Sequence, residues 1–166
     1  MTSLRGVRQS GIPTLSWIAS LILAMTIALA SAHATESLPL GSVIIEHKDK
    51  PVSFTVEVAH TAEQRQDGLM NRDSIGSLEG MLFLFPRADI YEFWMANTYI
   101  SLDMIFVNSN EIVHIEHDVE PLSRKPRGTN QLVTSVIELP GGTARDENIQ
   151  VGDKVSYIFA RDLEIR

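Results

Sequence analysis

The sequence predicts a mainly β domain, a barrel or sandwich of seven or eight strands with two short helices. Residues 52–58 alternate apolar and polar side chains, which is typical of a strand with one buried face. Residues 80–85 form an apolar run too short for a helix of its own, which indicates a strand buried on both sides. The Asn108-Ser109-Asn110 segment separates two further apolar runs and favours a turn. Short strands joined by turns therefore dominate the expected fold.

The other expected elements follow from local signals. Thr61 and Gln64 form a capping box, which predicts a helix from Ala62 to about Met70. The polar segment 118–130 contains two prolines and is expected to be a long mobile loop. With the strand at 52–58, we expect strands at 42–48, 80–85 (stopped by Pro86), 92–96, 102–107, 111–117, 132–139 and 156–160. We also expect a helical turn over 143–148 that is capped by Thr143.

The composition limits the classes of function. The chain of 166 residues has room for one domain, or two at most. It contains no cysteine, which excludes a disulfide scaffold, a thiol nucleophile and a Cys-ligated zinc or iron–sulfur site. Its formal charge of −7 argues against general binding to nucleic acid, which needs a basic surface. The sequence has neither a phosphate-cradling glycine loop nor a G-x-S-x-G elbow, and we expect no cofactor.

The N-terminus has the layout of a secretory signal. Arg5 and Arg8 precede an apolar run over 17–30, which is followed by the small-x-small motif Ala32-His33-Ala34. We therefore expect residues 1–34 to be a signal peptide cut after Ala34, so that the protein is periplasmic or secreted. The alternative is an uncleaved anchor, because the uncharged stretch 11–32 reaches the roughly 20 residues that span a bilayer. The membrane would then be contacted only through this segment.

The rest of the chain forms a single unit in this interpretation. Residues 35–41 are expected to be a short linker, and residues 42–166 a single β domain. A domain of roughly 130 residues can bury enough surface to be stable without disulfides. We expect this domain to be a monomer.

Two arginines near the predicted helix are candidates for ligand binding. Arg65 and Arg72 lie seven residues apart, so they project from one face if the helical geometry persists to Arg72. Two guanidinium groups on one side match a carboxylate, a phosphate or a sugar acid. The alternative is that they pair with nearby acidic residues.

The hairpin 102–117 supplies a candidate catalytic or metal site. A turn centred on Ser109-Asn110 sets Asp103 opposite Glu116, and the period of two then places Asp103, His114 and Glu116 on one face. Facing carboxylates are unfavourable unless a proton, a cation or an arginine lies between them. A metal held by His114, Glu116 and Asp103 is the weaker alternative, and a one-residue change of register would disperse the cluster.

A third candidate lies at the end of the strand 92–96. Trp94 is followed by Asn97 and Thr98, and an aromatic ring beside small polar groups can form a pocket wall with a hydrogen-bonding rim. Such a wall suits sugars or flat ligands. The alternative is that Trp94 fills the core.

Several short motifs also occur in a fixed order: Gln64-Arg65, Gly68-Leu69-Met70-x-Arg72, Gly80-Met81-Leu82-Phe83-x-Phe85, Phe93-Trp94-Met95-x-Asn97-Thr98, Leu102-Asp103 and Val136-Ile137-Glu138-Leu139-Pro140-x-Gly142-Thr143. With these, nearly all of residues 42–158 resemble the prokaryotic family called domain of unknown function 192. The chain has Gln64 where that family usually has Glu, and Ala96 where it has Lys or a similar residue. The resemblance implies a compact jelly-roll-like β fold, often exported, with no established activity. His114 and Glu116 lie outside the motifs, which weakens the metal hypothesis.

The leading functional hypothesis is an exported β domain that binds an anionic or sugar-like small ligand. Its site would contain Arg65, Arg72, Trp94, Asn97, Thr98 and Asp103, with the loop 118–130 as a lid. One alternative is an envelope-associated hydrolase that uses Asp103 as general base and an arginine to steady negative charge. Another is a module that binds an envelope protein through apolar surface beside Phe93 and Tyr99.

Overall fold

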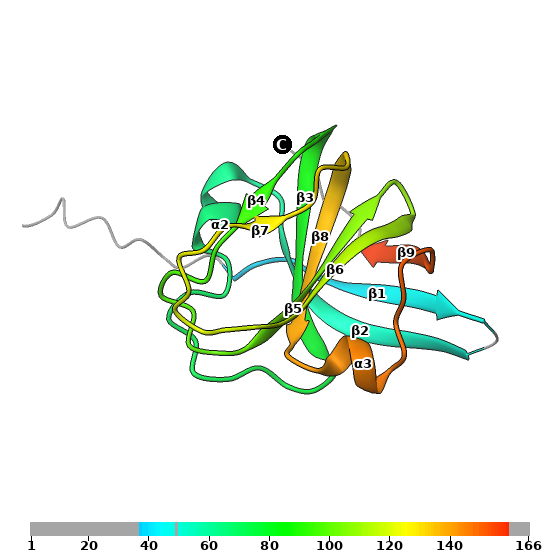
Figure 1. The fold of residues 1–166 in the computed structure, drawn as a ribbon, viewed down its shortest axis with the longest axis horizontal. Coiled ribbons are helices and arrows are strands. Elements are labelled where there is room, and N and C mark those ends of the chain that lie inside the picture. The colour runs from blue at the N-terminus through cyan, green and yellow to red at the C-terminus, as the bar shows by residue number, and fades with distance from the viewer. Residues whose placement is uncertain (1–36, 49, 160–166) are drawn as a thin grey trace, which may run out of the picture. The chain divides into compact units, whose positions relative to one another are not determined.

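Seven strands close into a barrel in the order β1-β2-β3-β8-β5-β6-β9 (Figure 1). The computed structural model describes residues 37–48 and 50–159, and the expected signal 1–34 with its cut after Ala34 lies outside them. The barrel strands are β1 (Leu40–His47), β2 (Lys50–Ala59), β3 (Glu79–Asp89), β5 (Leu102–Asn108), β6 (Glu111–Val119), β8 (Val133–Pro140) and β9 (Lys154–Phe159). The mainly β fold that the sequence predicts is confirmed, and its form is a closed barrel.

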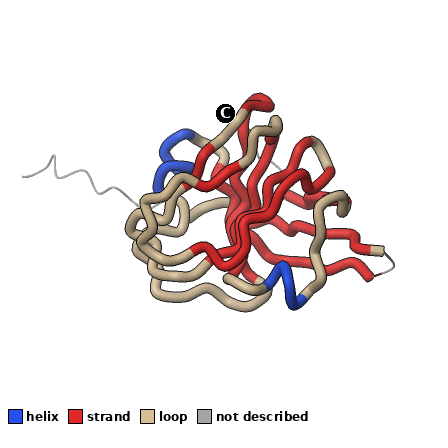
Figure 2. Tube along the Cα trace, in the orientation of Figure 1, coloured by secondary structure: helices blue, strands red, loops and turns tan. Residues whose placement is uncertain are grey.

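The helices found in residues 37–48 and 50–159 are short and lie on opposite sides of the strands (Figure 2). They are α2 (Ala62–Asp67) and α3 (Thr143–Asp146). No helix within the described ranges is long and apolar enough to cross a membrane. The two helices expected from the capping signals are therefore present, but both end earlier than predicted.

The end of α2 is set by glycine. Gly68 follows the helix with a φ of 49°, a left-handed conformation that a glycine adopts without steric cost. At the start of the helix the expected capping box is present: the Gln64 N–H donates to Thr61 Oγ1, and Gln64 Oε1 accepts from the Thr61 N–H. The helix thus stops at Asp67 instead of Met70, and helical spacing does not extend to Arg72.

Three neighbouring strands, β3, β8 and β5, are apolar on both faces. Their alternate residues Leu82, Ile105 and Ile137 belong to a buried cluster inside the barrel. The residues between them, including Phe83 and Phe106, belong to a second buried cluster on the outer face. The prediction that residues 80–85 are buried on both sides is confirmed, because α2 and the segments around β4 cover this outer face (Figure 1).

The strand β3 continues beyond Pro86, where the sequence predicts its end. The pairing of β3 with β8 shifts register between Leu84 and Asp89, so Pro86 lies in an irregular stretch that does not need its missing N–H. At the other end of the domain, β1 begins at Leu40, within the expected linker.

The segment 118–130 is not a free loop. Two of its residues form β7 (Arg127–Gly128), which pairs with β4 (Glu92–Phe93) in a two-stranded sheet. The Met95 N–H also donates to the Ser123 carbonyl at 2.8 Å, and the Leu122 N–H donates to the Thr98 carbonyl at 3.0 Å. The segment is a loop between β6 and β7, as expected, but these backbone hydrogen bonds and the β4–β7 pairing hold it against residues 92–98, which argues against a free lid.

Gly80 allows β3 and β8 to approach closely. A Cβ at this position would overlap the Glu138 carbonyl oxygen and lie 2.7 Å from Leu139 Cδ2. We expect Gly80→Ala to lower the free energy of unfolding by roughly 1–3 kcal/mol, the usual effect of overpacking. Denaturant titration measures the change. Gly76→Ala is the control, because its Cβ would meet only the side chain of exposed Glu79; equal stability of the two variants would contradict the prediction.

Candidate functional site

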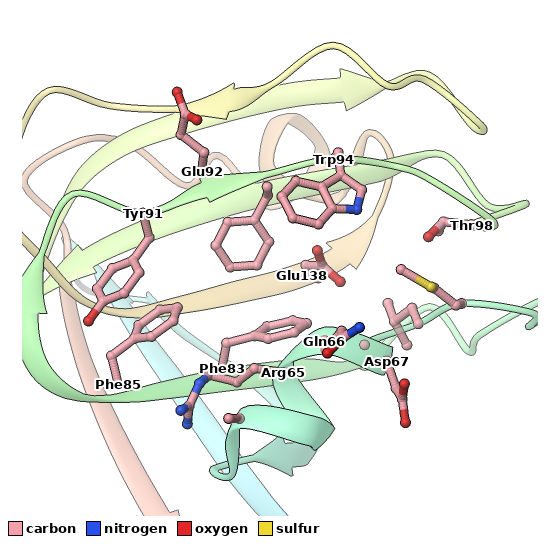
Figure 3. Close-up of a pocket in the computed structure, with 15 residues that line it drawn as sticks. Arg65, Gln66, Asp67, Phe83, Phe85, Tyr91, Glu92, Trp94, Thr98 and Glu138 are labelled. Carbon is pink, nitrogen blue, oxygen red and sulfur yellow. The ribbon is translucent and has the colours of Figure 1, made fainter.

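A pocket of about 370 Å³ opens on the outer face of β3 and β8. It lies between α2 with the turn that follows it, the aromatic end of β3, and the segment that contains β4 (Figure 3). The walls are largely apolar and are formed by Leu69, Met70, Phe83, Phe85, Tyr91, Phe93 and Trp94. The polar side chains that line it are Arg65, Gln66, Asp67, Glu92, Thr98 and Glu138.

The aromatic walls are packed against one another. Phe83 and Phe93 meet edge to face with centroids 5.2 Å apart, and Phe85 and Tyr91 stack with centroids 3.6 Å apart. The two Phe residues come from the outer face of β3, whereas Tyr91 and Phe93 come from the segment that folds back over it. Contacts of this kind fix the rings, so the pocket is formed before any ligand arrives.

Glu138 lies in the pocket among these apolar side chains. Its cross-strand neighbours on β3 and β5 are Met81 and Met104, so the alternation of β8 places it on the outer face. The residue is only 5% exposed, and no hydrogen bond or ion pair of its carboxyl group occurs within the described residues; its oxygens are not among the fully enclosed unpaired atoms, so they border the pocket. Burial raises the pKa of Glu138 to about 8, because water no longer solvates the charged form.

Arg65 lies at the aromatic end of the pocket. Its Nη1 donates to the backbone carbonyls of His60 at 2.7 Å and Leu84 at 2.9 Å. The guanidinium also lies over the Phe85 ring, 5.6 Å from its centroid. The packing of α2 on β3 thus holds this cation in place, and only part of its hydrogen-bonding capacity remains for a ligand.

Arg72 does not join Arg65. Its guanidinium forms a two-pronged pair with Glu57, at 2.6 Å and 2.5 Å, and it is absent from the pocket lining assembled from the described residues. The expected single face is wrong because α2 ends at Asp67. The structural alternative, in which an arginine pairs with a nearby acid, holds for Arg72.

Asp103 is a buried structural carboxylate. Its Oδ1 accepts from the N–H groups of Asp118 at 2.8 Å and Gly142 at 3.1 Å, and its Oδ2 accepts from the Ala144 N–H at 2.7 Å. It therefore caps α3, the role that the sequence assigned to Thr143. Asp103 lies on the inner face of β5, opposite to the face that carries the pocket, so it does not meet Arg65 or Arg72 there.

The expected cluster of Asp103, His114 and Glu116 is wrong in register. Asn108 pairs with Glu111 as predicted. The pairing shifts by one residue between Val107 and Phe106, so that Glu116 lies opposite Met104 instead of Asp103. His114 Nε2 lies 3.3 Å from Glu116 Oε1, and Arg127 Nη1 lies 3.4 Å from Glu116 Oε2. Within the described residues no group of three or more His, Cys, Asp or Glu side chains is placed to hold a metal.

Of the third candidate group, Trp94, Asn97 and Thr98, only two residues line the pocket. Trp94 and Thr98 line the pocket, and Trp94 is 52% exposed, so it does not simply fill the core. Asn97 is exposed and adopts a φ of 57° in the turn, where its carbonyl accepts from the Asn71 N–H. Its side chain is not part of the lining found among the described residues. Arg65, Trp94 and Thr98 are thus the predicted residues that the pocket brings together.

The family model of DUF192, described as "Uncharacterized ACR, COG1430", matches residues 43–157. The chain belongs to the DUF192 family. Two crystal structures are similar to this DUF192 domain. One is a "putative transcription regulator" from Sinorhizobium meliloti 1021, with a TM-score of 0.71 and 32% identity over 73% of this chain and 95% of that one. The other is a protein of unknown function from Novosphingobium aromaticivorans DSM 12444, with a TM-score of 0.71 and 34% identity over 75% of this chain and 89% of that one. No curated protein matches the chain.

The residue that the sequence reasoning missed in this DUF192 chain is Glu138. A signal was present, since Glu138 is the one charged residue in the strand Val133–Pro140. A charge in a strand that is buried on both faces needs a partner or a purpose. The sequence pattern predicts only a strand over residues 132–139, and it does not reveal that the outer face of this strand is covered.

Proposed function

We propose that the pocket between α2 and β3 binds a small ligand with a flat or sugar-like body. Support comes from the aromatic side chains of Phe83, Phe85, Tyr91, Phe93 and Trp94, which gather in one preformed cavity with a few polar groups at its edge. Aromatic faces with polar neighbours suit the apolar and hydroxylated faces of such ligands. The observation that carries the proposal is that these rings surround the carboxyl group of Glu138, which has no partner in the described part of the chain.

Of the two ligand classes considered from the sequence, the sugar-like one keeps more support than the anionic one. The anionic hypothesis needs two arginines, and Arg72 is already paired with Glu57. Asp67, Glu92 and Glu138 line the pocket together with Arg65, but Figure 3 shows the exposed carboxyl groups of Asp67 and Glu92 pointing away from the cavity, so Glu138 is the carboxyl group aimed into it. Repulsion among like charges therefore disfavours an anion.

The binding test uses the fluorescence of Trp94. Trp17 and Trp94 are the only tryptophans, so Trp17→Phe in the full chain leaves one reporter, which lines the pocket. We expect at least one member of a panel of sugars, flat aromatics, amines and organic acids to change the emission in a saturable way. Tyr91→Ala should weaken that binding several-fold to about tenfold, because one stacked ring contributes roughly 1 kcal/mol.

The control for this test is Tyr99→Ala. Tyr99 is 49% exposed and is not among the pocket-lining residues of the described chain, so its removal should leave the affinity unchanged. The proposal is wrong if no panel member saturates the signal, or if Tyr91→Ala binds as tightly as the parent chain.

We further propose that the domain acts outside the cytoplasm after removal of residues 1–34. The basic start, the apolar run and the Ala32-His33-Ala34 motif support this. Mass spectrometry of the protein recovered from the periplasm or medium should give the mass of residues 35–166. Recovery of the intact chain in the membrane fraction would favour the anchor instead. We do not extend the regulator description of the Sinorhizobium protein to this chain, because its charge of −7 argues against binding to nucleic acid.

A protein partner is the second candidate function. Trp94, Tyr99 and Leu122 are each about half exposed, and the Leu122 N–H donates to the Thr98 carbonyl, which places Leu122 beside this edge. Exposed apolar side chains near one another favour an interaction surface. Tyr99→Ala distinguishes the two candidates, since it should weaken a protein contact and leave the small-ligand affinity unchanged. The hydrolase hypothesis is not retained, because Asp103 is engaged by three backbone N–H groups.

A further inference from the structure

We propose that the pocket selects ligands carrying an organic ammonium group, which is seated against Glu138 and the surrounding aromatic rings. This inference rests on the proposed small-ligand function and names the class of ligand. It follows from the geometry of three features: the unpartnered carboxyl group, the aromatic faces around it, and the balance of charge in the pocket.

The carboxyl group and the rings face a common space. Figure 3 shows Glu138 between Trp94 on one side and Phe83 on the other. The face of an aromatic ring attracts cations, most strongly for Trp, and the attraction grows where water is excluded. Arg65 already makes such a cation–π contact with Phe85, because its Cζ lies 5.6 Å from the centroid of that ring. The rings nearer to Glu138 have no such cation among the described residues.

The charges around Glu138 also favour a cation. The helix α2 contributes Arg65 and Asp67 to the lining, and the segment over β3 contributes Tyr91 and Glu92. The strands on either side of β8 place Met81 and Met104 next to Glu138, and neither can titrate. The exposed carboxyl groups of Asp67 and Glu92 point away from the cavity in Figure 3, so Glu138 is the charged group aimed into it, while the Arg65 guanidinium is held by backbone carbonyls at its Nη1.

A buried carboxyl group gains most from a ligand of opposite charge. Burial disfavours the ionised form of Glu138 and raises its pKa to about 8. In the absence of a ligand the side chain therefore stays mostly protonated at neutral pH. An ammonium group beside it stabilises the carboxylate and lowers that pKa, so binding near neutral pH releases a proton. The affinity for the cation should then rise with pH by up to about tenfold per unit until Glu138 is ionised, whereas a neutral ligand lacks this gain.

Choline and its uncharged counterpart 3,3-dimethyl-1-butanol test the inference, since they share shape and hydroxyl group and differ in charge. Binding to the Trp17→Phe full chain is followed by Trp94 fluorescence at about pH 6.5 and about pH 8.5. We expect choline to bind at least tenfold more tightly than the alcohol at the higher pH, with a smaller preference at the lower pH. Glu138→Gln should abolish the preference and its pH dependence, and Glu120→Gln, at an exposed site outside the pocket lining, should not.

The outcomes separate this inference from the proposed function. Equal affinity for choline and the alcohol, or tight binding of only a neutral sugar from the panel, overturns the ammonium inference and leaves small-ligand binding in place. Failure of every probe overturns both. If Glu138→Gln does not fold, calorimetry of choline binding to the parent chain in two buffers of different ionisation enthalpy replaces it. Release of a proton on binding supports the inference, and its absence at about pH 7 contradicts it.

Discussion

Glu138→Gln is expected to remove a fall in stability that the parent chain shows as pH rises from about 5 to about 8. The pKa of a glutamate in an unfolded chain is near 4.5, whereas burial raises the pKa of Glu138 in the folded chain to about 8. Between these values the folded state binds one proton more than the unfolded state. The free energy of unfolding must therefore decrease with pH, by at most about 1.4 kcal/mol per unit from this group, and level off above about pH 8.

Urea titrations of both chains at several pH values measure this effect. We expect similar stabilities near pH 5, where both side chains are uncharged, and an advantage of a few kcal/mol for Glu138→Gln near pH 8. Glu120→Gln is the matched control, because it removes an exposed carboxylate and should leave the slope unchanged. Parallel pH profiles of the free energy of unfolding for Glu138→Gln and the parent chain would show that Glu138 is solvated or paired in solution. That result would contradict the raised pKa of Glu138 in the pocket.

A gain in stability on removing Glu138 has a meaning for function. A residue that lowers stability and has no partner among residues 37–48 and 50–159 conflicts with the packing preference of its site, and such conflicts are typical of functional positions. Two apolar strands, β3 and β5, flank it, and Val136, two residues earlier on the same face of β8, is fully buried. The simplest account is that the carboxyl group serves a ligand.

The fold could be predicted largely because its signals are local. The alternation of residues 52–58, the capping box at Thr61 and the turn at Asn108-Ser109-Asn110 each depend on a few neighbouring residues, and each element is present in the structure. Errors arose where a distant segment decides. The strand β3 passes Pro86 because its pairing with β8 becomes irregular there, and residues 127–128 form a strand only because β4 lies beside them.

The candidate site was harder to predict than the fold. The register that groups Asp103, His114 and Glu116 holds at Asn108 and Glu111, but Val113 is an extra residue in β6 and moves the side chains of residues 114–116 to the other face. Such a bulge has no clear mark in the sequence. The pocket joins α2, β3, the β4 segment and β8, and no spacing within one element reveals that Arg65, Trp94 and Glu138 meet there.

Asp103→Ala is expected to destabilise the domain strongly, by roughly 3 kcal/mol or more. The carboxylate accepts from the N–H groups of Gly142 and Ala144 at the start of α3 and of Asp118 at the end of β6. Each buried donor left without an acceptor costs about 1–3 kcal/mol, so the losses add to a large part of a typical domain's stability. Asp103→Asn keeps one acceptor oxygen and should lose less.

Asp146→Ala provides the comparison for Asp103→Ala, because Asp146 lies in the same short helix but its side chain is 75% exposed. Denaturant titration should show a small change for Asp146→Ala and a large one for Asp103→Ala. Ligand binding adds a second measurement: Asp103 lies on the inner face of β5, so Asp103→Asn should keep the pocket's affinity while it loses stability. A carboxylate that only caps α3 can affect ligand binding only through folding. If Asp103→Asn lost ligand affinity without losing stability, Asp103 would therefore have a direct role in binding.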